Sequence, residues 1–210
     1  MIIAIDGPAG SGKGTLARKL ANALGYAHLD TGKLYRAVGM SVVEAGENPA
    51  NEEAALRAAR SLEPQMVVNK DLLGDIAAAS ASKVAAIRSV RAILLAFQRE
   101  FANAPPNRAK GAVLDGRDIG TVVCPDADIK LFVTASTEVR AKRRHKELLD
   151  RGEPSIYSRV LQDMKVRDKR DEGRAVAPLK PAHDALVIDT SELDADAVFE
   201  TAMNIVSEDA

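Results

Sequence analysis

The chain has little of several residue types that commonly define a class of protein. Of its 210 residues, one is cysteine (Cys124), none is tryptophan and 3% are aromatic. A single cysteine excludes an internal disulfide, and a reducing compartment is natural for such a chain. The histidines His28, His145 and His183 are widely spaced and show no metal-ligand pattern. These absences argue against a disulfide-stabilised secreted domain and against a structural metal site.

The sequence also lacks a long apolar run and a strong excess of charge of either sign. The first apolar stretch is short, and no run long enough to cross a bilayer follows it. We therefore expect no signal peptide, no membrane segment and a cytoplasmic location. The net charge of −1 gives no reason to expect binding to nucleic acid or to a membrane. Basic residues are concentrated in one place, because residues 140–174 hold 12 Lys or Arg and 7 Asp or Glu, which suits an anionic small molecule.

The most informative segment that is present begins at Gly7. An apolar run over residues 2–5 predicts a buried strand before it, and apolar residues at helical spacing predict a helix over residues 13–24 after it. Glycines in such a turn let backbone N–H groups close around anionic oxygens, and the helix N-terminus adds a favourable dipole. The residues of this candidate phosphate-binding loop are Gly7, Pro8, Ala9, Gly10, Ser11, Gly12, Lys13, Gly14 and Thr15.

The loop fits the P-loop pattern G-x-x-x-x-G-K-[ST] with one departure. Gly14 stands where Ser or Thr is expected, and Thr15 follows it. In this pattern Lys13 is the mobile cation that reaches the β- and γ-phosphates of a nucleotide. The alternative is an ordinary turn between a strand and a helix, which the flanking apolar pattern disfavours.

Apolar strands that alternate with helical segments predict an α/β fold. We expect strands at residues 1–6, 26–30, 112–115, 129–133 and 185–188. Helices are expected at residues 13–24, 31–46, 51–62, 76–87, 90–101, 155–171 and 194–206, with a further basic helix that ends near residue 149. Asn51 or a neighbour is expected to cap one helix, and Ser155 another. The pattern indicates a P-loop NTPase-type five-stranded parallel sheet with helices on both faces.

We expect a single domain over residues 1–210. Its core comprises residues 1–45, 89–149 and 176–210. Residues 46–88 are expected to form an inserted subdomain, in which residues 66–68 are a candidate small strand. Residues 150–175 are expected to form a basic lid.

Polar residues follow the second predicted strand. Thr31 places a hydroxyl at the start of a helix, and Arg36 lies on its next turn. Ligands of parallel sheets bind beyond the carboxyl ends of the strands, so this pair is suited to hold a substrate phosphate. The alternative is a capped helix with a surface arginine, and this segment alone does not decide between the two.

The segment after the third predicted strand offers three charged groups. Asp115 closes an apolar strand in the manner of a Walker B acid, which organises Mg²⁺ through its waters. Arg117 can clamp a phosphate with its guanidinium fork. Asp118 can accept a hydrogen bond from the exocyclic amino group of cytosine, which uracil lacks. The alternative is an Arg–Asp surface pair in a turn.

A third charged segment lies near residue 170. Helical spacing predicts one shared face for Arg167, Arg170, Asp171 and Arg174. Several guanidinium groups on one face suit the stabilisation of charge on a transferring phosphoryl group. The alternative is a salt-bridged helix that faces solvent.

Five motifs taken together resemble those of the bacterial cytidylate kinase family: GPAGSGKGT, DTGKLYR, SKVAAIRSVR, LDGRDIGT and RDKRDEGRAVAPL. The similarity covers nearly the whole chain and keeps the motif order. Membership of this family would imply ATP-dependent phosphorylation of CMP and dCMP to CDP and dCDP with Mg²⁺. It would also make residues 46–88 the subdomain that binds the nucleoside monophosphate.

The resemblance implies roles for single residues. Residues 7–15 would bind the ATP phosphates, and Asp115 would act on the metal through water. The implied catalytic cations are Lys13, Arg117, Arg170 and Arg174. The implied contacts with CMP are Thr31, Tyr35, Arg36, Ser82, Arg91, Arg117, Asp118, Arg167, Asp171 and Arg174.

Positions within the implied CMP set match different parts of the nucleotide. Ser82, Arg91 and Asp118 match positions that contact the cytosine base. Arg36, Arg117 and Arg174 match positions that contact the phosphate, and Arg167 and Asp171 match positions near the sugar. Arg170 matches a lid arginine that reaches the ATP side.

The chain departs from the family pattern at two places. Residues 62–82 are shorter and less regular than the usual insert, and Ser89 stands where a proline is common. The departures bear more on the implied role of Ser82 than on that of Asp118.

Two other functions remain open. A P-loop kinase for another nucleoside monophosphate or a small metabolite would share the phosphate-binding features. A GTPase-like switch is a different class, but residues 69–72 read Asn-Lys-Asp-Leu and fail the guanine motif Asn-Lys-x-Asp at its fourth position. The expected partners are ATP and CMP or dCMP, with no nucleic acid and no membrane. We expect a monomer, because hinge closure needs no second subunit.

Overall fold

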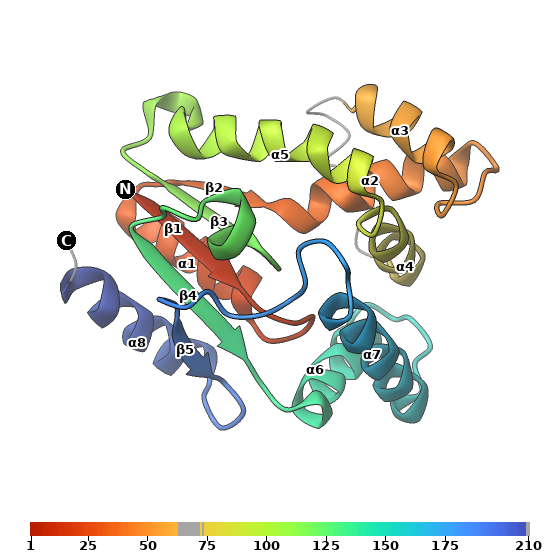
Figure 1. The fold of residues 1–210 in the computed structure, drawn as a ribbon. Helices are drawn as coiled ribbons and strands as arrows, with labels where there is room; N and C mark the ends of the chain where they lie inside the picture. The colour runs from red at the N-terminus through yellow and green to blue at the C-terminus, as the bar shows by residue number, and fades with distance from the viewer. Residues whose placement is uncertain (63–71, 73, 209–210) are drawn as a thin grey trace.

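The computed structural model describes residues 1–62, 72 and 74–208, which form an α/β fold (Figure 1). Five strands make one sheet in the order β2-β3-β1-β4-β5, and every neighbouring pair is parallel. The strands are β1 (Ile2–Asp6), β2 (Ala27–Asp30), β3 (Ala112–Gly116), β4 (Ile129–Thr134) and β5 (Leu186–Asp189). The predicted five-stranded parallel sheet is confirmed.

Helices connect the strands, as expected of parallel neighbours that need crossover connections. They are α1 (Lys13–Leu24), α2 (Thr31–Glu44), α3 (Glu52–Arg60), α4 (Asp75–Val84), α5 (Arg88–Asn103), α6 (Thr137–Asp150), α7 (Tyr157–Glu172) and α8 (Ala195–Glu208). A 3-10 turn, η3 (Pro106–Arg108), precedes β3, and a π-helix, η4 (Ile119–Val123), follows it.

Alternation of side chains along β1 divides the core into two layers. Ile3 and Ile5 belong to a buried cluster that includes Leu20 of α1. Ala4 belongs to a second cluster that includes Leu34 of α2. Successive strand residues point to opposite faces, so helices cover the sheet on both sides.

Of the two helix-capping residues predicted from the sequence, one is confirmed and one is wrong. Asn51 caps α3 as predicted, because its side chain accepts a hydrogen bond from the Ala54 N–H at 3.1 Å. The predicted cap Ser155 is wrong, since Ile156 is the residue that precedes α7. The Ser155 hydroxyl lies 2.8 Å from Nδ1 of His145, and this contact engages it away from the helix end.

One helix boundary and one element differ from the expectation, and one predicted strand is not tested. α4 ends at Val84 instead of residue 87, because residues 85–87 fold into a tight turn before α5. The π-helix η4 has no counterpart in the sequence prediction. It forms because the carbonyl of Asp118 accepts bonds from both Val122 and Val123 N–H groups. The candidate strand at residues 66–68 lies outside the described residues.

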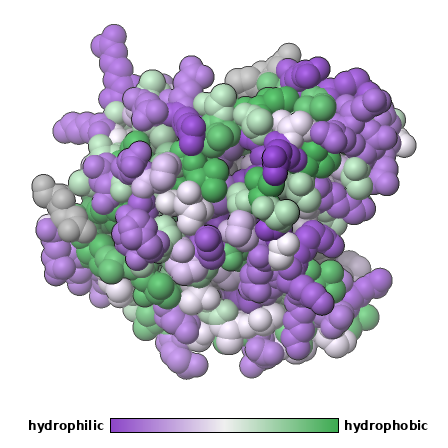
Figure 2. Space-filling view, viewed as in Figure 1, coloured by the Kyte–Doolittle hydropathy of each residue, from purple (hydrophilic) through white to green (hydrophobic). Residues whose placement is uncertain are grey.

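Helices α4 and α7 lie on the side of the sheet toward which the strands point (Figure 1). The face seen in Figure 2 is largely hydrophilic, with apolar side chains in small patches. In the described ranges, no helix is both long enough and apolar enough to cross a membrane.

The crossing of α2 and α4 positions the helix that carries Ser82. A Cβ atom on Gly39 would lie 2.5 Å from Oγ and 2.8 Å from the backbone carbon of Ser80. Backbone atoms cannot move aside as a flexible side chain does. Glycine at this position therefore sets how closely the two helices approach.

We expect Gly39→Ala to lower the free energy of unfolding by about 1–3 kcal/mol, because the added methyl group overpacks this crossing. Urea-induced unfolding followed by circular dichroism measures the change. Gly74→Ala is the matched control, since a Cβ there meets no atom of the described residues within 4 Å and the φ of Gly74 is −75°. Equal stability of the two variants would contradict the prediction.

Candidate functional site

The candidate phosphate-binding loop joins β1 to α1 and has the backbone that its glycines predict. Gly7, Gly10 and Gly12 have φ angles of 153°, 76° and 91°, which L-residues with side chains rarely adopt. A Cβ atom on Gly7 would lie 2.0 Å from the carbonyl oxygen of Val133, so no larger residue fits. The loop therefore packs against the end of β4 and leads into the N-terminus of α1, where free N–H groups favour an anion.

Two side chains of this loop are donors suited to an anionic oxygen. Lys13 donates from Nζ to the carbonyl of Pro8 at 3.2 Å. Burial, followed by the nearby charge of Arg117, lowers the pKa of Lys13 to about 7. A phosphate beside the amine would favour its charged form and raise that pKa again. Ser11 is fully buried, and its hydroxyl has no hydrogen-bond partner within the described part of the chain.

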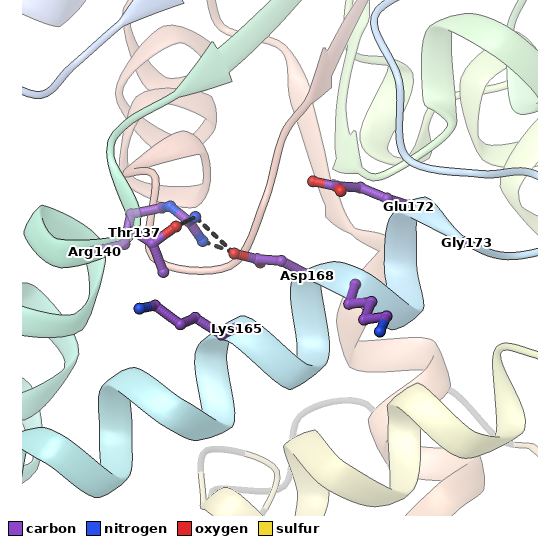
Figure 3. A pocket seen from close by; sticks show the side chains of 7 residues that line it. Thr137, Arg140, Lys165, Asp168, Glu172 and Gly173 are labelled. Atoms are coloured by element: carbon purple, nitrogen blue, oxygen red, sulfur yellow. Dashed lines mark hydrogen bonds and ion pairs between the residues drawn. The ribbon is translucent and has the colours of Figure 1, made fainter.

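A cavity of about 550 Å³ opens between α6 and α7 (Figure 3). Its lining residues are Thr137, Arg140, Lys165, Asp168, Lys169, Glu172 and Gly173. Arg140 also contacts the phosphate-binding loop, since its Nη1 donates to the carbonyl of Ala9 at 3.2 Å. The cavity therefore adjoins the phosphate-binding loop through Arg140. Its lining includes three cationic side chains, Arg140, Lys165 and Lys169.

A buried ion pair joins the two helices of this cavity. Arg140 donates to both carboxylate oxygens of Asp168, at 3.1 and 2.7 Å, and Figure 3 shows the two side chains meeting across the helices. Bidentate pairs of this kind fix a guanidinium in direction as well as position. Neither residue was among the predicted site residues. The basic composition of α6 was visible in the sequence, but the partner on α7 was not.

The predicted residues after β2 lie next to those after β3. The Thr31 hydroxyl donates to the carbonyl of Asp115 at 2.8 Å. Arg36 donates to the Asp30 carboxylate at 2.7 Å, so its guanidinium is held at the carboxyl end of β2. The alternative of a solvent-facing surface arginine does not hold, because Arg36 is largely covered.

Asp118 is buried and pairs with an arginine of another helix. Its carboxylate accepts a hydrogen bond from Arg91 of α5, and both side chains are more than 90% covered. The Arg91 guanidinium lies 5.6 Å from the centre of the Tyr35 ring, a cation–π arrangement. Three residues that the family resemblance implies for the acceptor thus come together. The alternative of a surface pair between Arg117 and Asp118 is wrong.

Asp171 is the centre of an arginine cluster. It accepts from Arg117 Nε at 3.1 Å and from Arg174, and Arg167 Nε lies 3.9 Å from it. Burial alone would raise the pKa of Asp171, but the neighbouring arginines, Arg117 first, hold it below its usual value. Burial and the charge of Arg117 lower the pKa of Arg167 to about 10.

The arginine cluster corrects two expectations. Arg174 lies beyond the end of α7 at Glu172, so the four predicted residues do not all share one helical face. The solvent-facing helix proposed as the alternative is also wrong, because Asp171 is 1% exposed. Arg170 departs from the other three: its Nη1 donates to the Ser82 hydroxyl of α4 at 2.9 Å.

Asp115 is the residue best placed to act on a metal ion. One of its oxygens lies 2.7 Å from His28 Nε2, and the other faces Gly14 in the first turn of α1. Among the described residues, no three His, Cys, Asp or Glu side chains gather as a metal cage. One carboxylate beside a phosphate loop fits Mg²⁺, which takes few protein ligands and completes its shell with water and substrate phosphates.

One further residue escaped the sequence prediction although it lies directly before the loop. Asp6 ends β1, is 4% exposed, and accepts hydrogen bonds from the segment that follows Asp118. A carboxylate at the end of an apolar strand was the signal that identified Asp115, and it applies equally to Asp6.

Comparisons with known proteins identify the family of this chain. Residues 3–208 match the family profile described as cytidylate kinase. A cytidylate kinase of Paramagnetospirillum magneticum is 62% identical over 98% of this chain and 97% of its own length. A cytidylate kinase of Rhodospirillum rubrum is 58% identical over 99% of this chain and 97% of its own length.

The fold also resembles that of solved structures. An uncharacterized protein from Eubacterium ventriosum is 18% identical, with a TM-score of 0.56 over 99% of this chain and 98% of its own. At that identity the likeness concerns the fold alone. The profile match over nearly the full length, together with the two close relatives, establishes that this chain belongs to the cytidylate kinase family.

Proposed function

We propose that this chain transfers the γ-phosphoryl group of ATP to CMP and dCMP, giving ADP with CDP or dCDP. One observation carries the proposal beyond family membership. The Asp115 carboxylate faces Gly14 of the donor loop, and Arg117, two residues further on, donates to Asp171 at 3.1 Å, so the loop and the arginine cluster adjoin. The charges of Arg117 and Arg167 also act to lower the pKa of Lys13. Cations gathered in this way repel one another, and phosphates placed between them would relieve that repulsion.

The donor is proposed to lie on the loop of residues 7–15, with its phosphates at Lys13 and the N-terminus of α1. The adjacent cavity offers room for the remainder of ATP. Its walls carry Arg140, Lys165 and Lys169, of which Arg140 is already held in place by Asp168.

The acceptor is proposed to lie between α2, α4, α5 and the arginine cluster. The Asp118 carboxylate would accept from the amino group of cytosine, and Ser82 and Arg91 would complete the base site. The CMP phosphate would lie near Arg36, Arg117 and Arg174, with Thr31 and Tyr35 beside it and with Arg167 and Asp171 on the sugar side.

The chemistry needs no nucleophilic side chain. A phosphate oxygen of CMP forms a bond to the γ-phosphorus while the bond from that phosphorus to the β,γ-bridging oxygen breaks, and ADP leaves. Lys13 and the arginines stabilise the charge on the transferring group, as prearranged cations in a shielded site do. Bound Mg²⁺ would supply charge neutralisation at the phosphates, with Asp115 holding it through water.

Water must be excluded, because it would otherwise accept the phosphoryl group. We propose that residues 46–88 and 150–175 close over the two nucleotides while the core, residues 1–45, 89–149 and 176–210, stays fixed. Arg170 would then turn from Ser82 toward ATP. A monomeric state and a cytoplasmic location stay predictions.

An ATP-coupled assay with Mg²⁺ across CMP, dCMP, UMP, AMP and shikimate tests the proposed function. We expect the highest kcat/KM with CMP and dCMP. Preferred use of AMP or shikimate would instead support a kinase for another nucleotide or a small metabolite. No described contact favours that alternative.

We expect Lys13→Ala to lower kcat by roughly 100- to 1000-fold, because the transition state loses the cation that the donor loop itself supplies. Steady-state kinetics with saturating ATP and CMP measure it. Lys19→Ala is the control, since Lys19 lies on the same helix but pairs with exposed Asp196. Near-normal turnover in a folded Lys13→Ala protein would remove Lys13 from the mechanism.

We expect Asp118→Ala to lose the preference for CMP over UMP to a greater extent than it loses turnover, because the amino-group acceptor is gone. The ratio of kcat/KM values for the two acceptors measures this loss. The KM for ATP and the thermal midpoint serve as controls, because Arg91 loses its partner in this variant. An unchanged ratio would remove Asp118 from base recognition.

A further inference from the structure

We infer that Asp6 is a positioning residue for acceptor specificity: its carboxylate holds the backbone segment that presents Asp118 to the base. The inference rests on the proposed function, in which Asp118 distinguishes cytosine from uracil. Asp6 would not touch the nucleotide. It would act through the segment it binds.

The hydrogen bonds of Asp6 are specific to a carboxylate. Oδ1 accepts from the Ile119 N–H and Oδ2 from the Gly120 N–H, each at 2.8 Å. Both oxygens are thus used as acceptors, and the side chain is 4% exposed. A side chain with one acceptor and one donor, such as an amide, cannot serve both N–H groups.

The segment held in this way is short. β3 ends at Gly116, and only Arg117 and Asp118 separate it from η4. Gly116 is closely packed, because a Cβ atom there would lie 2.6 Å from Thr31 Oγ1 and 2.7 Å from Ile119 Cδ1. With β3 fixing one end and Asp6 the other, a change at Asp6 must be taken up by the two residues between.

Burial disfavours the charged form of Asp6. Burial raises the pKa of Asp6 to about 7, although the two backbone bonds oppose that shift. A carboxyl whose pKa is raised on folding lowers the free energy of unfolding as pH rises from its unfolded pKa, 3.8, toward 7. Stability alone would therefore favour a neutral side chain here, whereas two acceptor oxygens serve the Asp118 segment.

The first test is Asp6→Asn, which keeps the shape of the side chain and removes one acceptor. We expect the ratio of kcat/KM for CMP over UMP to fall roughly tenfold, comparable to the loss of one charge-assisted hydrogen bond. The loss should appear mainly in the KM for CMP, with the KM for ATP nearly unchanged. An unchanged ratio, or an equal loss with both acceptors, would overturn the inference, because a merely structural role affects both alike.

A double-mutant cycle shows whether Asp6 acts through Asp118. In the Asp118→Ala background, Asp6→Asn should have no further effect on the acceptor ratio. A second, independent drop in the ratio would overturn the proposed route. An Asp118→Ala enzyme that keeps the wild-type ratio would instead overturn the base-recognition role in the proposed function, and this inference with it.

Asp128→Asn is the matched control. Asp128 also accepts a backbone hydrogen bond from β1, from the Ile2 N–H at 2.6 Å, but at the opposite end of the strand. We expect this variant to keep the wild-type acceptor ratio. A ratio lowered as far as in Asp6→Asn would assign the effect to β1 as a whole and would overturn the inference.

A pH series on the unmodified enzyme keeps the inference testable if Asp6→Asn does not fold. The groups that act on the Asp6 charge are Asp118, Lys13 and Cys124. We expect the ratio of kcat/KM for CMP over UMP to fall between pH 8 and pH 6, as Asp6 gains a proton and loses an acceptor. The phosphate titration of the two acceptors, and that of Lys13, are common to both and cancel in the ratio. A ratio independent of pH over this range would overturn the inference.

Discussion

The candidate site depends on the attraction between Asp171 and the arginines around it, because this attraction holds several like charges close together. Arg117 comes from the end of β3, Arg167 from α7 and Arg174 from the segment beyond it, and all three approach one buried carboxylate. Without that carboxylate the guanidinium groups would repel one another across a poorly solvated space. With it, the end of the sheet and the end of α7 are tied together, and an excess of positive charge remains. Anionic substrates are the natural complement of that excess.

Two other buried ion pairs fix the remaining walls of the site. Arg91 with Asp118 joins α5 to the segment after β3, and Arg140 with Asp168 joins α6 to α7. Buried pairs of this kind contribute little net stability, because desolvation offsets much of their attraction. These pairs orient the arginines, because each guanidinium is held in one orientation by a carboxylate from a different element. The parallel sheet makes such pairs possible, because its strands all deliver their following residues to one edge.

The sequence predicted most of the fold and the edge of the sheet, at the carboxyl ends of the strands, to which the candidate residues belong. The glycine spacing after β1 and the apolar strands were decisive, because each reports a local requirement of the backbone. Pairings over long distances were not predictable in the same way. Nothing near Arg140 in the sequence points to Asp168, and nothing near Arg170 points to Ser82, because those partners are brought together only by the packing of helices. The π-helix η4 was also missed, since it depends on how Asp6 and the carbonyl of Asp118 satisfy backbone N–H groups that no residue pattern marks.

The contact between Arg170 and Ser82 has a thermodynamic consequence for a reaction with two substrates. An acceptor that takes the place of Arg170 at the Ser82 hydroxyl has to break this hydrogen bond, so part of its binding energy is consumed. The displaced guanidinium is then free to meet the other nucleotide. Once one substrate has broken the contact, the second no longer has to, and each therefore increases the affinity for the other by the same factor. Synergism between the two ligands would thus be built into a single hydrogen bond between α4 and α7.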